Sequence, residues 1–148
     1  MSDTLLHNPS RMLVQLLLDA ALVAAFDATS GWPAFWEGMA DSPDDAISIT
    51  DTLGIAEGVT MPDGAIQEHQ GFQLRVRSSR PHDGYTKIAQ LRQYLSESVA
   101  NQLVNVDGTQ YTVHAVTKLG PILPLGREVP GSRRSAHTVN GLVSVTRR

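Results

Sequence analysis

The chain has 148 residues, of which 41% are hydrophobic, and this length and composition suit one domain with one core. Charged residues make up 18% and aromatic residues 5%, which excludes a disordered polyelectrolyte and a strongly basic nucleic-acid binder. Cysteine is absent, so disulfides, thiol nucleophiles and thiolate metal sites are excluded. The N-terminus lacks the basic and apolar regions of a secretory signal, and we therefore expect synthesis in a cytoplasm.

The formal net charge of −3 is divided unevenly along the chain. Residues 1–70 hold eleven acidic residues and one basic residue, whereas residues 71–148 hold eleven basic and four acidic residues. If the two halves lie on different faces, one subunit presents complementary surfaces for head-to-tail contact in a ring or filament. If they interleave in the fold, the charges neutralise each other within one subunit. The sequence leaves both arrangements open.

The first predicted element is a helix over the apolar run at residues 12–26. Asn8 is placed to cap it and Pro9 lies in its first turn, a typical helix start. The run is shorter than the ~20 residues of a membrane span, and Gln15 and Asp19 interrupt it. We therefore predict a helix that is buried in the core or in a subunit contact.

A Trp-rich segment at about residues 31–45 follows, with Trp32 and Trp36. These tryptophans either pack across the first helix as core residues or anchor a partner in a pocket. Apolar and polar residues alternate over 47–50 and predict a short strand, after which glycines indicate irregular backbone. A strand at 66–69 is expected to run on past Gly71, which we interpret as a bulge.

Residues 71–95 are the most informative part of the chain, because they predict one strand, one turn and one helix. In the strand, the apolar residues are Phe72, Leu74 and Val76, and the polar residues are Gln73, Arg75 and Arg77. This alternation puts one face in the core and both arginines on a face open to water. Asp83 is predicted to cap the following helix, whose apolar residues recur at spacings of three and four from Tyr85 to Val99.

The second half returns to strands. Apolar alternation on both sides of Asp107-Gly108 predicts a hairpin with a two-residue turn. Residues 118–134 contain three prolines and three glycines, and we expect a long irregular loop there. Residues 135–146 read as a strand in which Asn140-Gly141 is either a tight turn or a bulge. Together these elements predict one domain over residues 1–148, in the α+β (α/β) class. It would have a small mixed, mostly antiparallel sheet and two main helices packed on one face.

Catalytic chemistry has no sequence signature in this chain. The histidines are His7, His69, His82, His114 and His137. No two of them lie at i, i+4 on a predicted helix, and His114 is expected at the surface. The glycines form neither a phosphate loop nor a dinucleotide fingerprint, and no G-x-S-x-G is present. We predict no enzyme, no cofactor and no metal site.

A family resemblance rests on the order of three segments: RVRSSRPHDGYTKIAQLRQYL, then a hairpin followed by GPILPLGRE, and a closing TVNGLVSV strand. Over most of residues 10–146 this pattern resembles the minor capsid or tail-terminator proteins of long-tailed bacteriophages. The Trp-rich segment has no counterpart that we can match to the family pattern.

The resemblance implies a small α/β domain whose copies join, expected as a hexamer, into a ring at the head-proximal end of the tail tube. Such a ring stops tube growth and binds the tail tube protein and a head-completion or connector protein. It implies a virion location, in the tail or neck, after assembly in the host cytoplasm. The alternatives are a head-tail connector or head-completion protein of the neck, and a soluble non-catalytic binding domain of a bacterial host.

Contact with partners is assigned to arginines and to the tryptophans. The candidate interface residues are Arg75, Arg77, Arg80, Arg127, Arg133, Arg134, Trp32 and Trp36. The alternative for the arginines is an ordinary solvated surface. With a net charge of −3, the chain is expected to let the genome pass through the ring without specific binding and to contact no membrane. Reversing the charge of Arg133 and Arg134 together is expected to leave the fold intact and weaken assembly.

Overall fold

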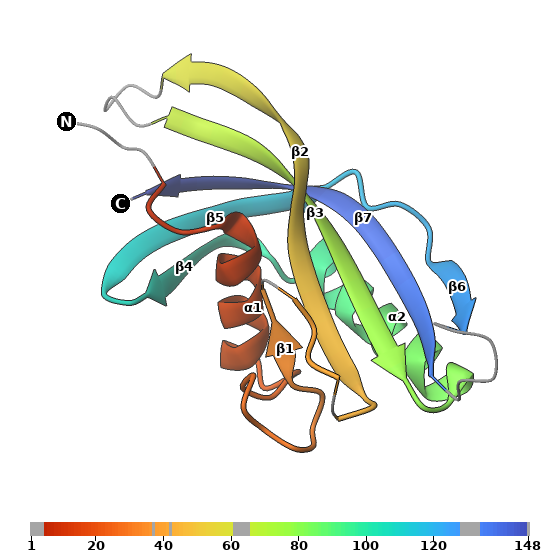
Figure 1. Ribbon diagram of the computed structural model, residues 1–148. Coiled ribbons are helices and arrows are strands. Elements are labelled where there is room, and N and C mark those ends of the chain that lie inside the picture. Colours follow the sequence, from red (N-terminus) through yellow and green to blue (C-terminus); the bar gives the residue numbers. More distant parts are fainter. Residues whose placement is uncertain (1–4, 37, 42, 61–65, 128–133, 148) are drawn as a thin grey trace.

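The computed structural model describes residues 5–36, 38–41, 43–60, 66–127 and 134–147, which form two helices and one curled seven-stranded sheet (Figure 1). The helices are α1 (Pro9–Asp19) and α2 (Pro81–Glu97). The strands are β1 (Ala34–Phe35), β2 (Ala46–Thr60), β3 (Ile66–Ser78), β4 (Ala100–Val106), β5 (Thr109–Thr117), β6 (Leu123–Arg127) and β7 (Ser135–Arg147). The predicted α+β class, with a mostly antiparallel sheet, is confirmed.

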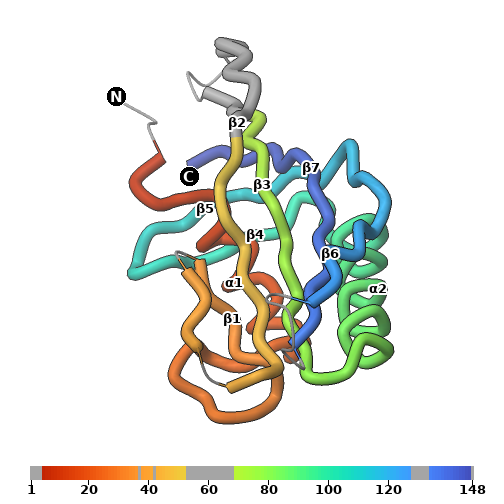
Figure 2. The backbone as a smooth tube through the Cα atoms, turned by 45° about the vertical axis from the view of Figure 1, so that its right-hand side comes forward, coloured from red at the N-terminus to blue at the C-terminus, as the bar shows by residue number. Residues whose placement is uncertain are grey.

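The strand order is β1-β2-β3-β7-β5-β4, and every pair except the parallel β1–β2 pair is antiparallel. On the side away from β3, strand β7 pairs first with β6 and then with β5. Its first residues, 135–138, pair with β6, and residues 142–147 pair with β5, while its ladder with β3 is unbroken. As a result β6 and β4 form separate edges of one sheet (Figure 2).

The hydrophobic core lies between the inner face of the sheet and the two helices. α1 contributes Met12, Leu13, Leu16 and Leu17, and α2 contributes Ile88, Leu91 and Leu95. The sheet contributes Ile47, Ile49, Phe72, Leu74, Val76, Val104, Val106, Tyr111, Val113, Val139, Val143 and Val145. The predicted alternation over residues 72–76 is confirmed, because Phe72, Leu74 and Val76 are fully buried.

α1 begins as predicted, with Asn8 at the N-cap position and Pro9 in the first turn, but the Asn8 side chain makes no capping hydrogen bond and donates instead to Asp51. The helix ends at Asp19. Ala21 takes a positive φ of 58°, its N–H donates to the Leu18 carbonyl, and the Leu22 N–H donates to the Leu17 carbonyl. This is the Schellman arrangement that closes a helix. The prediction of a helix to residue 26 was wrong, since the chain after the turn pairs with the residues around Pro33.

α2 begins earlier than the sequence suggested. Arg80 occupies the N-cap position and Pro81 starts the helix, so Asp83 lies inside the first turn, and the prediction that Asp83 caps it was wrong. Proline suits this position because it lacks an N–H that would otherwise have no partner. The carboxylate of Asp83 near the N-terminus favours the helix through the macrodipole.

The strands depart from prediction in β2 and β3. β2 extends to Thr60, beyond the short strand predicted at 47–50, and its register against β3 shifts between Thr52 and Ile55 and between Ile55 and Val59. Gly71 pairs in regular register with β7, so the bulge predicted there was wrong and the irregularity lies in β2. Each shift leaves only a few residues of β2 unpaired, so β2 and β3 continue to pair on both sides of it.

The hairpin between β4 and β5 is confirmed. Asp107 has a φ of 51° and Gly108 a φ of 85°, the positive values that a two-residue turn of this type requires. The Asn105 side-chain oxygen accepts a hydrogen bond from the Gly108 N–H at 2.9 Å. Local sequence chemistry therefore accounts for the turn.

Residues 118–134 contain β6, so the expectation of a wholly irregular loop was wrong; residues 128–133 lie outside the described residues. Asn140-Gly141 is neither a turn nor a bulge against β3, since β7 runs straight through it. A Cβ on Gly141 would lie 3.0 Å from Cζ of Phe72 and 2.9 Å from Cδ2 of Leu119. Glycine is needed there because the Phe72 ring packs directly on the backbone.

Candidate interface surfaces

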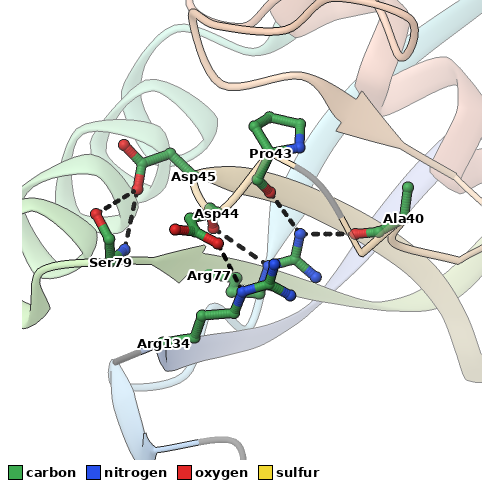
Figure 3. A network of polar contacts seen from close by, with 7 residues as sticks. All are labelled: Ala40, Pro43, Asp44, Asp45, Arg77, Ser79 and Arg134. Carbon is green, nitrogen blue, oxygen red and sulfur yellow. Dashed lines mark hydrogen bonds and ion pairs between the residues drawn. The ribbon is translucent and has the colours of Figure 1, made fainter. Parts of the chain in front are cut away.

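Arg77 fastens the chain between β1 and β2 to the sheet (Figure 3). One of its terminal nitrogens donates to the carbonyls of Ala40 and Pro43, each at 2.6 Å, and its Nε donates to the Asp44 carbonyl at 3.2 Å. We call residues 38–41 and 43–45 the pinned segment. The side of β3 predicted to be open to water is covered at Arg77, which is 3% exposed, because the pinned segment folds over it.

Two carboxylates of the pinned segment contact the second half of the chain. Asp44 accepts from Nε of Arg134 at 2.7 Å, and Asp45 accepts from the backbone N–H of Ser79 at 3.0 Å (Figure 3). Elsewhere, Arg11 pairs with Asp107 at 2.8 Å. The Asp44–Arg134 pair joins an acid of the acidic half to a base of the basic half within one subunit, whereas Arg11–Asp107 joins the two halves with the signs reversed.

The remaining candidate arginines lie in different places. Arg75 lies with Asp41 and Gln73 in a groove of about 470 Å³ between the outer sheet face and the pinned segment. Arg80 is exposed at the start of α2, and Arg127 is exposed at the end of β6. Arg133 lies outside the described residues. The structure therefore gathers Arg75, Arg77 and Arg134 at the pinned segment, while Arg80 follows Ser79, which donates to Asp45, and Arg127 pairs with Ser135, next to Arg134.

Trp36 forms part of a small apolar cavity beside α1. Its ring meets the Phe26 ring edge-on at 5.7 Å between centroids, and the Arg11 guanidinium lies 5.0 Å from its centre. The cavity has a volume of about 180 Å³ and is lined by Phe26, Phe35, Trp36 and Gly38, which we call the aromatic pocket. Phe26, which no sequence motif singled out, is 56% exposed.

Trp32 has a different environment. Its backbone has a positive φ of 64°, and its side chain packs partly buried against the core. Nζ of Lys87 lies 5.9 Å from the centre of the ring and donates to the Leu22 carbonyl at 2.5 Å. Burial lowers the pKa of Lys87 from its ordinary value. Trp32 thus holds the chain after α1 against α2 within the subunit.

The histidines are distributed among separate contacts. His7 shares a hydrogen bond of 2.6 Å with the Tyr111 hydroxyl, His69 one of 2.8 Å with Ser144, and His114 one of 2.8 Å with Thr146. His114 is half-buried by these contacts rather than fully at the surface. His137 lies under α2, where burial lowers its pKa.

No group of three or more histidine, aspartate or glutamate side chains among the described residues is arranged to hold a metal ion. In the same part of the chain, neither helix has the length and apolar character needed to cross a membrane.

A family model described as bacteriophage tail terminator protein matches residues 17–123, more than half of the chain. The chain belongs to the bacteriophage tail terminator family. The family consists of structural virion proteins, so this terminator has a structural role in a phage tail, and the resemblance drawn from the sequence is confirmed. The match includes the pinned segment and ends at the first residue of β6.

Other comparisons add little to the family assignment. No curated protein matches this terminator significantly. Solved structures do match; in one of them the aligned chain is 17% identical, with 95% of this chain and 97% of the other covered and a TM-score of 0.49.

Proposed function

We propose that this terminator caps the head-proximal end of the tail tube as a homo-oligomeric ring, expected to be a hexamer, and joins it to the head-completion proteins. The observation that carries the proposal beyond the family match is β6, whose five residues are all exposed. An exposed apolar edge strand is a ready contact surface for another chain. The protein would act by contact and perform no chemistry of its own.

The candidate interface residues divide into two roles under this proposal. Arg80 and Arg127, which are exposed, would contact carboxylates of a neighbouring subunit, the tube or the neck, and we propose the same for Arg75 and Arg133. Arg77 would instead keep the pinned segment in shape, because its guanidinium binds three carbonyls of its own chain.

Arg134 and the tryptophans divide in the same way. Arg134 pairs with Asp44 and would support the pinned segment. Reversing the charge of Arg134 would therefore break this pair within the subunit as well as weaken assembly. Trp36 would serve the interface through the aromatic pocket, whereas Trp32 would serve the fold. The partners would be further copies of this chain, the tail tube protein and a head-completion or connector protein.

The genome is expected to pass through the ring without specific binding, since only a cationic lumen would retain phosphates. Assembly would take place in the host cytoplasm, and the finished ring would lie in the virion between tail and neck. Tight, salt-sensitive binding of DNA in a gel shift would contradict this part of the proposal.

Deletion of this reading frame from the phage tests the proposal, with lysates examined by negative-stain microscopy. Overlong or irregular tails detached from filled heads would support tube termination. Tails of normal length beside tailless or leaking heads would contradict it and favour a connector or head-completion role. Normal virions, together with a purified chain that stays monomeric and ignores tube protein, would favour a plain binding domain.

A further inference from the structure

Strand β6 presents apolar side chains to solvent. Leu123 is 44% exposed and Leu125 52% exposed, and β6 is joined to the sheet through its ladder with β7. Proline and glycine disturb strand pairing. Pro124 and Gly126 flank Leu125, so the leucine side chains rather than the backbone are the groups suited to contact another chain. The ladder with β7 shifts register between Pro124 and Gly126, which is where Leu125 lies.

The aromatic pocket is an apolar feature of the opposite kind, a cavity rather than a protruding strand. Its volume of about 180 Å³ suits one branched aliphatic side chain. Trp36 is held between Phe26 and Arg11, so a wall of the pocket is formed before any partner arrives. Preformed aromatic pockets are typical of the sites that dominate binding at interfaces.

The charges near the aromatic pocket and on β6 have opposite signs. Residues 12–74 contain ten acidic residues and no lysine or arginine. Asp27 directly follows Phe26 of the aromatic pocket, Asp41 comes three residues after Gly38, and both aspartates are exposed. β6 ends in the exposed Arg127. A contact between β6 and the pocket would therefore bring opposite charges together at its rim, which favours correct orientation and fast association.

Position in the sheet keeps the two surfaces apart within one subunit. A row of paired residues crosses the sheet from Ala34 in β1 through Ile47, Val76 and His137 to Pro124 in β6. In both views β2, β3 and β7 run between β1 and β6 (Figures 1 and 2). Two unlike surfaces separated in this way can meet head to tail between identical subunits, the type of contact that gives a ring when the rotation closes.

We propose that β6 of one subunit docks on the aromatic pocket of the next, with Leu125 entering the pocket and Arg127 facing Asp27 and Asp41. The occupant is a second copy of this chain. The inference rests on the proposed ring and names the surfaces that form it. Truncation of a central apolar anchor of this kind weakens association by tenfold or more.

Cross-linking tests the juxtaposition directly, because the chain contains no cysteine. Ala25→Cys places a thiol on an exposed residue next to the pocket, and Leu123→Cys places one on β6 beside the intact Leu125. Mixed one to one with a short bismaleimide, under conditions where the unmodified chain is assembled, the two variants should give cross-linked heterodimers. The double variant should give a ladder up to the closed ring.

The matched control replaces Leu123→Cys with Leu103→Cys, which is 55% exposed on β4, away from the proposed contact. If Ala25→Cys cross-links to Leu103→Cys as fast as to Leu123→Cys, the proposed contact is overturned. Rings that assemble without the expected cross-link would overturn the contact and leave the proposed ring standing.

A mixing experiment tests the head-to-tail character. Leu125→Asp and Phe26→Asp each remove one surface and leave the other, and both side chains are more than half exposed, so thermal unfolding should change little. Each variant alone should be monomeric by native mass spectrometry, and their mixture should give one-to-one dimers and nothing larger. Full rings from either variant alone, or a mixture that stays monomeric where the unmodified chain forms rings, would overturn the inference.

The failure of the proposed ring has a different signature. An unmodified chain that forms no ring even with tail tubes present, combined with tails of normal length after deletion of the reading frame, would remove both proposals together.

Discussion

The pinned segment is held by a buried arginine that donates to the carbonyls of Ala40, Pro43 and Asp44, whereas β6 is joined to the sheet through a short ladder with β7. In the first region backbone polar groups find partners within the subunit. In the second, two leucines remain in water. The contrast indicates that the pinned segment serves the stability of one subunit, and it supports the proposal that β6 serves contact between subunits.

The two regions involve free energies of similar size at different stages. A hydrogen bond to a charged donor contributes about 1.5–3 kcal/mol to folding. Burying a leucine side chain contributes about 1.5–3 kcal/mol, but for Leu125, which is 52% exposed, about half of that gain is available only when a partner covers it. Substitutions in the pinned segment should therefore change unfolding, and substitutions in β6 should change assembly.

The largest expected effect on folding comes from Arg77→Met, which keeps the bulk of the side chain and removes its hydrogen bonds. We expect the free energy of unfolding to fall by about 2–3 kcal/mol, because three carbonyls of the pinned segment lose a charged donor. Urea unfolding measures this. Arg80→Met, at an exposed position, is the control and should stay within about 0.5 kcal/mol of the unmodified chain. Equal effects from the two substitutions would contradict the assigned role of Arg77.

A smaller loss is expected from Gly141→Ala, at the point where β7 exchanges β6 for β5. The added Cβ would press on the Phe72 ring and on Leu119, and overpacking of this kind costs about 1–2 kcal/mol. Gly120→Ala is the matched control, because its Cβ would meet the Asn140 carbonyl oxygen at an ordinary 3.6 Å. Thermal unfolding of both variants should separate them, and identical midpoints would show that the ring of Phe72 moves aside freely.

Asp44→Asn should have a weaker effect still. It removes the ion pair with Arg134. The Asp44 side chain is 54% exposed and the Arg134 side chain 25% exposed, and ion pairs at the surface contribute about 0–1 kcal/mol to stability. The difference from the unmodified chain should shrink as salt is added, because ions screen exposed charges. A loss above about 2 kcal/mol, or one that salt leaves unchanged, would show that Asp44 does more for the pinned segment than pair with Arg134.

The smallest effect is expected from pH, through His137, which lies opposite Pro124 in the β6–β7 ladder. Burial lowers the pKa of His137 in the folded chain below its ordinary value of about 6.5. The unfolded chain therefore takes up the proton first as pH falls. Stability is complete above the unfolded pKa and decreases as pH falls from about 6.5 toward the folded pKa.

The measurement for His137 is urea unfolding at pH values above and below about 6.5. His137→Gln should show a smaller loss on acidification than the unmodified chain does. His82→Gln, at an exposed position, is the control and should follow the unmodified chain. Parallel curves for all three proteins would contradict a role for His137 in the acid response.

Prediction from sequence succeeded where structure follows from neighbouring residues. The Asp107-Gly108 turn depends on two adjacent residues that tolerate positive φ, and the alternation around Leu74 depends on a local period of two. It failed where a distant segment decides the outcome. Arg77 has the sequence position of an exposed residue and is buried because the pinned segment, more than thirty residues earlier, folds over it.

The other errors have the same origin. The apolar run of α1 continues past Asp19, but the left-handed Ala21 and pairing with the chain near Pro33 end the helix. β6 contains the proline and glycine of a loop, yet the first residues of β7 give it a partner strand. Neither the exposed Phe26 nor its place beside Trp36 follows from any periodicity, so the aromatic pocket could not be found from the sequence.

The row of paired residues from β1 to β6 gives the proposed ring a property of its own. Both contact surfaces would be carried by one continuous sheet, with no linker between them, so the angle from one subunit to the next would follow from the twist of that sheet. Neighbouring strands rotate by roughly 20–25° relative to one another. A substitution that alters this twist would then change the number of copies that close the circle and the diameter of the opening.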